Sequence, residues 1–333
     1  MTHFSWMPFY RELSIKLLQF RNERDRLIEI VLNAYKLSKI NMPKMDSTVR
    51  PTDMDPFTVF GMFNKQMKEA NRIALCLALK ELLVLGSDAP SDFDGIPVLN
   101  PLNATFYCFT GDSARSEHDV DALWDCFAAA IRYADIGDSD SEKAFIDAYD
   151  AAKDLKGNRW KLSMGLFWVR PDTFLNLDSR NQWFLMEMNA LGNAFAEKLK
   201  TLDGVPDGMT YIEICKDCIR SIRESSKYAS ISELSNDAWN TSEDKNRERR
   251  QNAVNTPDLD RTVRQTHYWL YAPGPNAEYW DPFCQDGIIA LGWGESGDLR
   301  NLSNREAIKN KLRNEWASPE SPVTHPSLAL WQF

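Results

Sequence analysis

Apolar residues recur at helical spacing through most of the first 226 residues, and this periodicity constrains the fold more than any other feature. We expect one long helix over residues 5–40 and a second helix that begins at Pro56 and breaks near Gly61. The same spacing predicts further helices at residues 118–135, 141–156, 181–200 and 210–226. Frequent proline and glycine make residues 86–103 a loop. Residues 1–235 should therefore form a mainly helical domain.

The composition changes after residue 235. Residues 236–265 are polar and densely charged, which predicts an interdomain linker. Strand-prone segments follow at residues 268–271 and 288–293, and a charged helix is expected at 303–315. The predicted class is α+β. Two strands and one helix cannot close a sheet, so we expect the domain at 266–333 to be truncated and the native chain to continue.

Composition narrows the class of protein. Hydrophobic residues make up 43% of the chain and aromatic residues 11%, which is typical of a globular protein. We find no secretory signal and no apolar run near the length that crosses a bilayer. Six scattered cysteines favour reduced thiols, and we expect a cytoplasmic location without membrane partners. The net charge of −9 argues against a nonspecific nucleic-acid binder but permits a local pocket for one base.

Two sets of motifs carry a family resemblance. Near the C-terminus the chain reads Tyr268-Trp-Leu-Tyr-Ala-Pro-Gly, Trp280-Asp-Pro-Phe, Gly287-Ile-Ile-Ala-Leu-Gly-Trp and Ala329-Leu-Trp-Gln-Phe. This resembles the opening of an EVE-type domain of the PUA-like fold. Earlier it reads Met54-Asp-Pro-Phe-Thr-Val-Phe-Gly-Met-Phe-Asn-Lys, Asp92-Phe-Asp-Gly-Ile-Pro-Val-Leu-Asn and Gly165-Leu-Phe-Trp-Val-Arg-Pro-Asp-Thr-Phe. These motifs resemble the region before the EVE-like module in AAA-family proteins identified as 5-methylcytosine-specific restriction enzyme B.

The resemblance implies a helical domain (1–235) followed by a partial EVE-like β-barrel (266–333). It also implies a reader module that binds DNA carrying modified cytosine by flipping the base into an aromatic pocket. In such proteins a downstream AAA+ motor uses GTP or ATP with Mg²⁺, works with a separate nuclease subunit and can bring about oligomerisation. This chain has no phosphate-binding loop of the Walker type, so we expect no cofactor within it and no catalysis by it.

Aromatic residues late in the chain are the first candidates for a ligand site. A flipped base is held between aromatic faces, with polar groups reading its edge. The candidates, together with a residue of a tight turn, are Trp269, Tyr271, Ala272, Trp280, Trp293 and Trp331. The plainer alternative for each ring is packing in the core of a small domain.

A second candidate set lies in residues 170–180, where Arg170, Asn176, Asp178 and Arg180 offer contacts to a phosphate or a base edge. The alternative is a turn in which Asp178 caps the next helix and pairs with Arg180. Three residues elsewhere in the chain are further candidates for this cluster in space: Asn64, Arg72 and Asp94.

Catalytic patterns are weak. Cys215 and Cys218 form a single pair, whereas a zinc site needs four ligands. A competing hypothesis is a standalone metal-dependent nuclease built on the carboxylates of Asp92, Asp94, Asp172 and Asp178. A further alternative is a segment that serves only as an oligomerisation scaffold.

Overall fold

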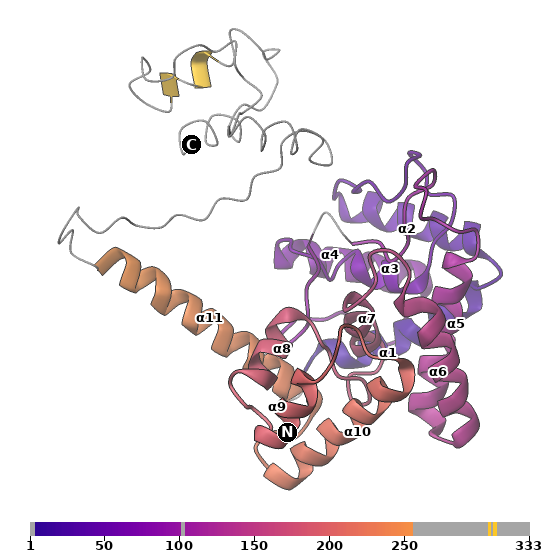
Figure 1. Ribbon diagram of the computed structural model, residues 1–333. Coiled ribbons are helices and arrows are strands. Elements are labelled where there is room, and N and C mark those ends of the chain that lie inside the picture. The colour runs from indigo at the N-terminus through magenta and orange to yellow at the C-terminus, as the bar shows by residue number, and fades with distance from the viewer. Residues whose placement is uncertain (1–3, 101–103, 256–305, 308, 312–333) are drawn as a thin grey trace, which may run out of the picture. The chain divides into compact units, whose positions relative to one another are not determined.

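The computed structural model describes residues 4–100 and 104–255, with residues 306–307 and 309–311 (Figure 1). The chain divides into two compact units, Met1–Thr256 and Pro257–Phe333. The named helices all lie in the first unit: α1 (Trp6–Leu17), η1 (Leu18–Phe20), α2 (Arg24–Ser38), α3 (Pro56–Gly61), α4 (Glu69–Leu83), α5 (Asp119–Ile136), α6 (Ser139–Lys153), α7 (Lys161–Val169), α8 (Ser179–Met186), α9 (Asn193–Lys200), α10 (Gly208–Ser225) and α11 (Ile231–Asn255). No helix in the described part of the chain is both long and apolar enough to cross a membrane.

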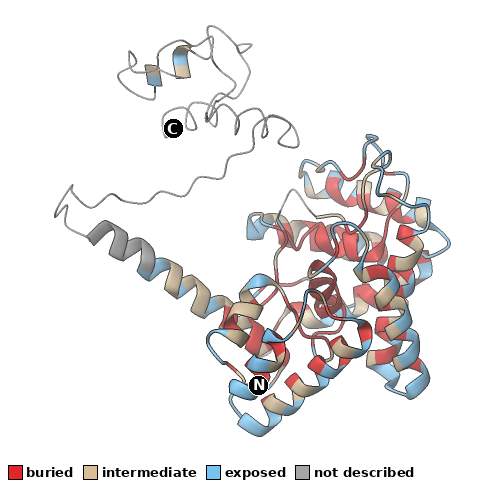
Figure 2. Cartoon of the chain, viewed as in Figure 1, coloured by how far each residue is buried: buried red, intermediate tan, exposed pale blue. Residues whose placement is uncertain are grey.

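Helix α7 is the centre of the first unit. All of its residues are buried, as are all residues of α3 (Figure 2). Helices α1, α3 and α5 pack against α7, and α5 also packs against α6. Gly165 permits the close approach, because a Cβ there would lie 2.7 Å from a ring carbon of Phe57. We call α7 and the helices that pack on it, α1, α3 and α5, the hub.

Three buried indoles tie loop segments to the hub. The ring nitrogen of Trp6 donates to the carbonyl of Asp94 at 3.0 Å, and that of Trp168 donates to the carbonyl of Pro97 at 3.1 Å. Trp124 donates to the carbonyl of Met54 at 3.0 Å. Buried backbone carbonyls need such donors where no helix or sheet supplies them. Tryptophans from α1 and α7 therefore hold the proline- and glycine-rich loop, and one from α5 holds the segment before α3.

The helices follow the predicted pattern, with two breaks. The helix expected at 5–40 is divided at residues 21–23, where Asn22, a residue that favours turns, separates η1 from α2. The helix expected at 181–200 is divided between α8 and α9 because Asn189 (φ 49°) and Gly192 (φ 93°) adopt left-handed conformations. The apolar residues keep helical spacing across both breaks, so the sequence pattern alone did not predict that these helices are divided.

The predicted α+β class is wrong. The described residues are mainly helical, without a sheet or barrel, and their β-type pairing is one isolated parallel bridge between Lys65 and Leu99. The prediction rested on β-prone composition, which specifies a strand only where a neighbouring strand pairs with it. The two segments expected to be strands, 268–271 and 288–293, lie outside the described residues.

Helix α11 occupies much of the segment expected to be a linker. It begins at Ile231 and continues to Asn255, so the first compact unit extends past residue 235. A narrow buried stripe, Ile231, Leu234, Ser235 and Ala238, fixes its first turns. This stripe has the spacing of one helix face, but charged residues beyond it dominated the composition of the segment.

Candidate functional site

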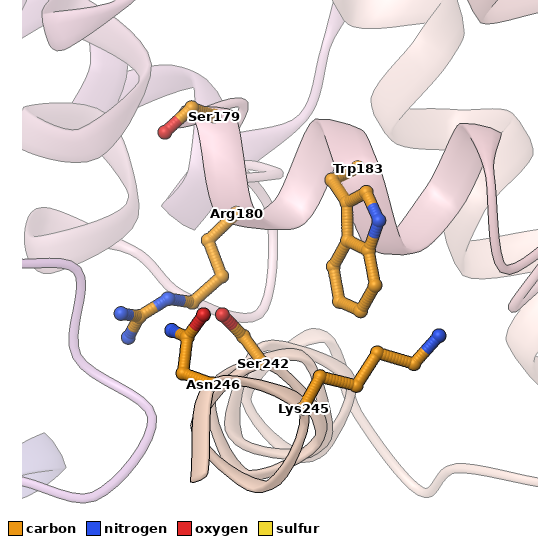
Figure 3. A pocket seen from close by; sticks show the side chains of 6 residues that line it. All are labelled: Ser179, Arg180, Trp183, Ser242, Lys245 and Asn246. Atoms are coloured by element: carbon orange, nitrogen blue, oxygen red, sulfur yellow. The ribbon is translucent and has the colours of Figure 1, made fainter. Parts of the chain in front are cut away.

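A polar pocket lies between α8 and α11 (Figure 3). Its volume is about 340 Å³, close to the lower end of small-molecule sites. The residues that line it are Ser179, Arg180 and Trp183 from α8 and Ser242, Lys245 and Asn246 from α11. We call it the α8–α11 pocket.

Hydrogen bonds at the start of each helix set the two walls. The carboxylate of Asp178 accepts from the backbone nitrogen of Asn181 at 2.8 Å and so caps α8. The hydroxyl of Ser235 in α11 donates to the carbonyl of Gly95 at 2.8 Å. The side-chain amide of Asn181 in turn lies 3.5 Å from the Ser235 hydroxyl, which joins α8 to α11.

Arg180 is oriented by two residues of α11. Its guanidinium lies 3.6 Å from the ring centroid of Trp239, a cation–π distance. One guanidinium nitrogen donates to the carboxylate of Glu243 at 3.0 Å, and both partners are partly exposed, at 24% and 42%. The Glu243 pair and the contact with Trp239 hold the guanidinium against α11, and its other terminal nitrogen is buried without a hydrogen-bond partner.

Lys245 and Trp183 form the other side of the pocket. The ammonium of Lys245 lies 5.3 Å from the ring centroid of Trp183 and 3.3 Å from the sulfur of Met188. Both side chains are half-buried. The pocket therefore combines two cations with a partly exposed indole, while Ser242 and Asn246 add hydrogen-bonding groups. Such a set suits a ligand with a negative group and a flat ring.

The second candidate set separates into different roles. Arg170 is 5% exposed and binds the carboxylate of Asp135 through two nitrogens, at 2.9 and 2.8 Å. Its remaining nitrogen donates to Ser14 and to the carbonyl of Val169, both at 2.7 Å. Every guanidinium nitrogen is thus engaged within the protein. This pairing lowers the pKa of Asp135, and Arg170 acts as a structural link in the hub.

Asn176 and Asp178 are also held within the protein. Asn176 is fully buried, and its side-chain oxygen accepts from the backbone nitrogen of Asp178 at 3.0 Å. Asp178 is the helix cap that the alternative interpretation expected. The expected pairing of Asp178 with Arg180 is not formed, since Arg180 binds Glu243. Of the four residues, Arg180 alone lines the α8–α11 pocket.

Asn64 and Arg72 form a separate buried cluster. The Asn64 side-chain oxygen accepts from Arg72 at 2.8 Å and from the hydroxyl of Tyr10 at 2.6 Å. The Arg72 guanidinium also lies 3.7 Å from the ring centroid of Phe93. Asp94 enters the structure through its carbonyl, which binds Trp6. These contacts position the segments on both sides of α4 and do not add ligands to the α8–α11 pocket.

The acidic residues of the nuclease hypothesis have other partners. Asp92 accepts from the hydroxyl of Ser5 at 2.6 Å, and Asp178 caps α8. Burial raises the pKa of Asp172. Within residues 4–100 and 104–255 and the short described segment after residue 305, no group of three His, Cys, Asp or Glu side chains is arranged to hold a metal ion.

Cys215 and Cys218 are buried free thiols in α10. Burial raises the pKa of Cys215 to about 12, which disfavours the thiolate that binds metals. The aromatic candidates lie outside the described residues, as does the turn residue grouped with them: Trp269, Tyr271, Ala272, Trp280, Trp293 and Trp331.

Sequence reasoning missed most of the α8–α11 pocket. Trp239 and Lys245 are missing from the predicted site residues because residues 236–265 are predicted to be a linker, and Trp183 falls in the helix expected at 181–200 without a signal of its own. One signal was available: Trp239, Ser242 and Asn246 follow one another at the spacing of a helix face, beside the buried stripe that starts at Ile231. That pattern predicts a helix with one polar and aromatic face.

A model of the DUF8425 family, described as a domain of unknown function, matches residues 6–241. This chain belongs to the DUF8425 family. The match runs from α1 into α11 and includes Ser179, Arg180 and Trp183 of the pocket, together with Trp239 beneath Arg180, but it ends before Ser242. Comparison with curated proteins and with solved structures found no match.

Proposed function

We propose that this DUF8425 chain is a DNA-recognition module and that the α8–α11 pocket receives one nucleotide. The observation that carries the proposal is the pairing of two cations with a partly exposed indole in one pocket. Arg180 and Lys245 would contact phosphate oxygens, and Trp183 would stack on a base.

The charge distribution supports a local contact. The chain has a net charge of −9, so affinity cannot come from a basic coat over the whole surface. A volume of about 340 Å³ suits one nucleotide unit, and a whole duplex does not enter it. A nucleotide that leaves the stack satisfies both limits.

Modified cytosine is the finer part of the proposal. The resemblance to restriction proteins motivates this part. Coupling to an AAA+ NTPase motor and a nuclease subunit, and a cytoplasmic location, belong to the same finer part of the proposal. The late aromatic residues, among them Trp280 and Trp293, belong to this finer part. DNA binding by the α8–α11 pocket does not depend on it.

The test is fluorescence anisotropy with the full chain and labelled duplexes that differ only in the modification of one cytosine. Arg180→Gln should weaken binding about tenfold or more and reduce the slope of log affinity against log salt by about one. Trp183→Ala should weaken it about fivefold to a hundredfold through lost stacking. Lys216→Met removes an exposed lysine of α10 that pairs with Glu142, and should leave the affinity within about twofold.

Glu243→Gln gives a second control with the opposite sign. It removes the carboxylate that competes for Arg180, so binding should become a few times tighter. If Arg180→Gln, Trp183→Ala and Glu243→Gln all bind as the wild type does, the α8–α11 pocket is not the DNA site. Equal affinity for every cytosine modification, unchanged by Trp280→Ala or Trp293→Ala, would remove only the modified-base proposal.

A further inference from the structure

Helix α4 is apolar on more sides than the described part of the chain covers. Leu75, Leu79 and Leu83 are buried on the side that faces the core. On the other side Leu77 is 52% exposed and Ile73 is only partly buried. A helix that is apolar all round is normally covered all round, because each exposed apolar side chain forgoes the gain from burial.

A groove runs along the uncovered side of α4, where this helix packs beside α2 (Figure 1). Leu37 of α2 is 48% exposed and lines the groove together with Leu77. Single exposed leucines are ordinary, but apolar residues that gather in one groove are typical of surfaces that bind another protein. The groove has a volume of about 540 Å³ and is lined by Leu37, Ser38, Ala74, Leu77, Ala78, Lys80 and Glu81.

Val84 extends this surface at the end of α4. Its side chain is 83% exposed, and its backbone is left-handed, with φ 54° and ψ 55°. Glycine or asparagine usually occupies this position, because a β-branched residue is unfavourable in the left-handed region. The folded chain therefore bears the strain without burying the side chain. A partner that covers Val84 would account for valine here.

The charges on this surface are complementary to themselves. Lys80 and Glu81 are adjacent, and both line the groove. Lys80 pairs with Asp88 at 3.0 Å, but Asp88 is fully exposed, so this pair is weak. Within the described residues the carboxylate of Glu81 has no hydrogen-bond or ion-pair partner. A cation and an anion side by side match the same two groups on a second copy of the chain.

We infer that the surface formed by α2 and α4 is an interface between two copies of this chain. Antiparallel pairing of the two α4 helices about a two-fold axis between Lys80 and Glu81 places Lys80 opposite Glu81 of the second copy. The same axis places Leu77 opposite Val84, so the apolar residues of each copy cover those of the other. Neither α8 nor α11 takes part, so this interface does not rest on the proposed DNA binding.

Sedimentation velocity of the full chain over a range of concentrations tests the inference. The wild type should form dimers with a Kd on the order of 10 μM, because the surface is small and partly charged. Leu77→Gln should weaken association about tenfold or more, because it places an amide in the apolar contact. The control is Met209→Gln, which changes an apolar residue of α10 that is 59% exposed and should keep the Kd within about twofold.

Val84→Asn separates association from folding. Asparagine tolerates the left-handed conformation, so this variant should be at least as thermally stable as the wild type. It should nevertheless dimerise more weakly, because the apolar contact with Leu77 of the second copy is lost. Thermal unfolding and sedimentation of the same sample measure the two effects.

Charge reversal tests the two-fold register. Lys80→Glu presents two adjacent carboxylates and Glu81→Lys presents two adjacent ammonium groups. At low ionic strength each variant alone should dimerise about tenfold more weakly than the wild type, because like charges meet across the axis. An equimolar mixture of the two variants should associate at least as tightly as the wild type, because unlike charges then meet at both contacts.

Three results would overturn the inference. The first is a wild type that stays monomeric up to about 500 μM, even if it binds a different protein through Leu77. The second is a dimer that Leu77→Gln and Val84→Asn form as tightly as the wild type. The third is a mixture of Lys80→Glu and Glu81→Lys that associates no better than each variant alone.

Discussion

The hub around α7 and the α8–α11 pocket use the same kinds of side chain in opposite ways. In the hub, all guanidinium nitrogens of Arg170 donate hydrogen bonds within the protein, to Asp135, Ser14 and a backbone carbonyl. In the pocket, Arg180 is 24% exposed, makes one ion pair and lies over the ring of Trp239, and one of its terminal nitrogens has no hydrogen-bond partner. Arg170 and Arg180 lie ten residues apart in the sequence but differ in how many of their N–H donors are already bound within the protein. The buried arginine has all of its nitrogens engaged, and the partly exposed one does not.

The largest expected effect comes from Arg170→Met. It removes the buried partner of Asp135 and Ser14, and we expect the free energy of unfolding to fall by about 3 kcal/mol, since Asp135 is 30% exposed and water compensates part of the loss. Chemical denaturation measures this. Arg11→Met removes the exposed second partner of Asp135 and should change stability by less than about 0.5 kcal/mol. Similar losses for both variants would contradict the structural role of Arg170.

Gly165→Ala tests the close packing of the hub. Alanine favours a helix by about 1 kcal/mol, but its Cβ would lie 2.7 Å from Phe57 and 3.2 Å from Phe106, so overpacking should leave a net loss of about 1–2 kcal/mol. The control is Gly86→Ala, whose Cβ meets only Glu12, at 3.6 Å. A stabilised Gly165→Ala protein would show that the hub has more space than described.

Asp55 gives the hub a pH dependence. Burial raises its pKa to about 6, so between about pH 4 and pH 6 the folded state holds a proton that the unfolded state has released. This contribution to stability is present below the unfolded pKa and is lost as the pH rises through 6. Asp55→Asn keeps a capping residue but does not titrate.

Relative to the wild type, the free energy of unfolding of Asp55→Asn should therefore rise by on the order of 2 kcal/mol between pH 4 and pH 7. Urea unfolding at several pH values measures the difference. A constant difference across this range would show that Asp55 titrates normally in the folded protein.

The smallest expected effect on stability belongs to the pocket. Arg180→Gln loses an ion pair between partly exposed groups, so the free energy of unfolding should change by less than about 1 kcal/mol while DNA affinity falls. Measured beside Arg170→Met, this variant separates the two regions. A loss as large as that of Arg170→Met would place Arg180 among the structural arginines.

Most helices were predictable because their apolar spacing is local. The periodicity over 118–135 and 210–226 corresponds to α5 and α10 within a few residues. Breaks such as the one at Asn189 depend on single backbone conformations, which periodicity does not report. The strand-prone segments that produced the α+β class lie outside the described residues, and the described residues form no sheet.

The site was less predictable because its contacts are distant in sequence. Arg170 resembled a phosphate ligand until its partner Asp135, in another helix, was known. The α8–α11 pocket forms because α8 and α11 pack side by side, and no local sequence pattern predicts that Arg180 and Lys245 lie near each other. Arg180 was predicted as a ligand contact from its residue type, but the other residues that line the pocket were not.

The family match ends at residue 241, within helix α11. The residues of α11 before and after this point differ in burial. Residues before it, such as Ala238, are buried and support the fold, whereas Ser242, Lys245 and Asn246 are only half-buried. Substitutions on those later turns reshape one wall of the pocket at little risk to folding. If the pocket binds a nucleotide as proposed, substitutions in this short stretch of α11 can change which one it binds while the rest of the helical unit stays as it is.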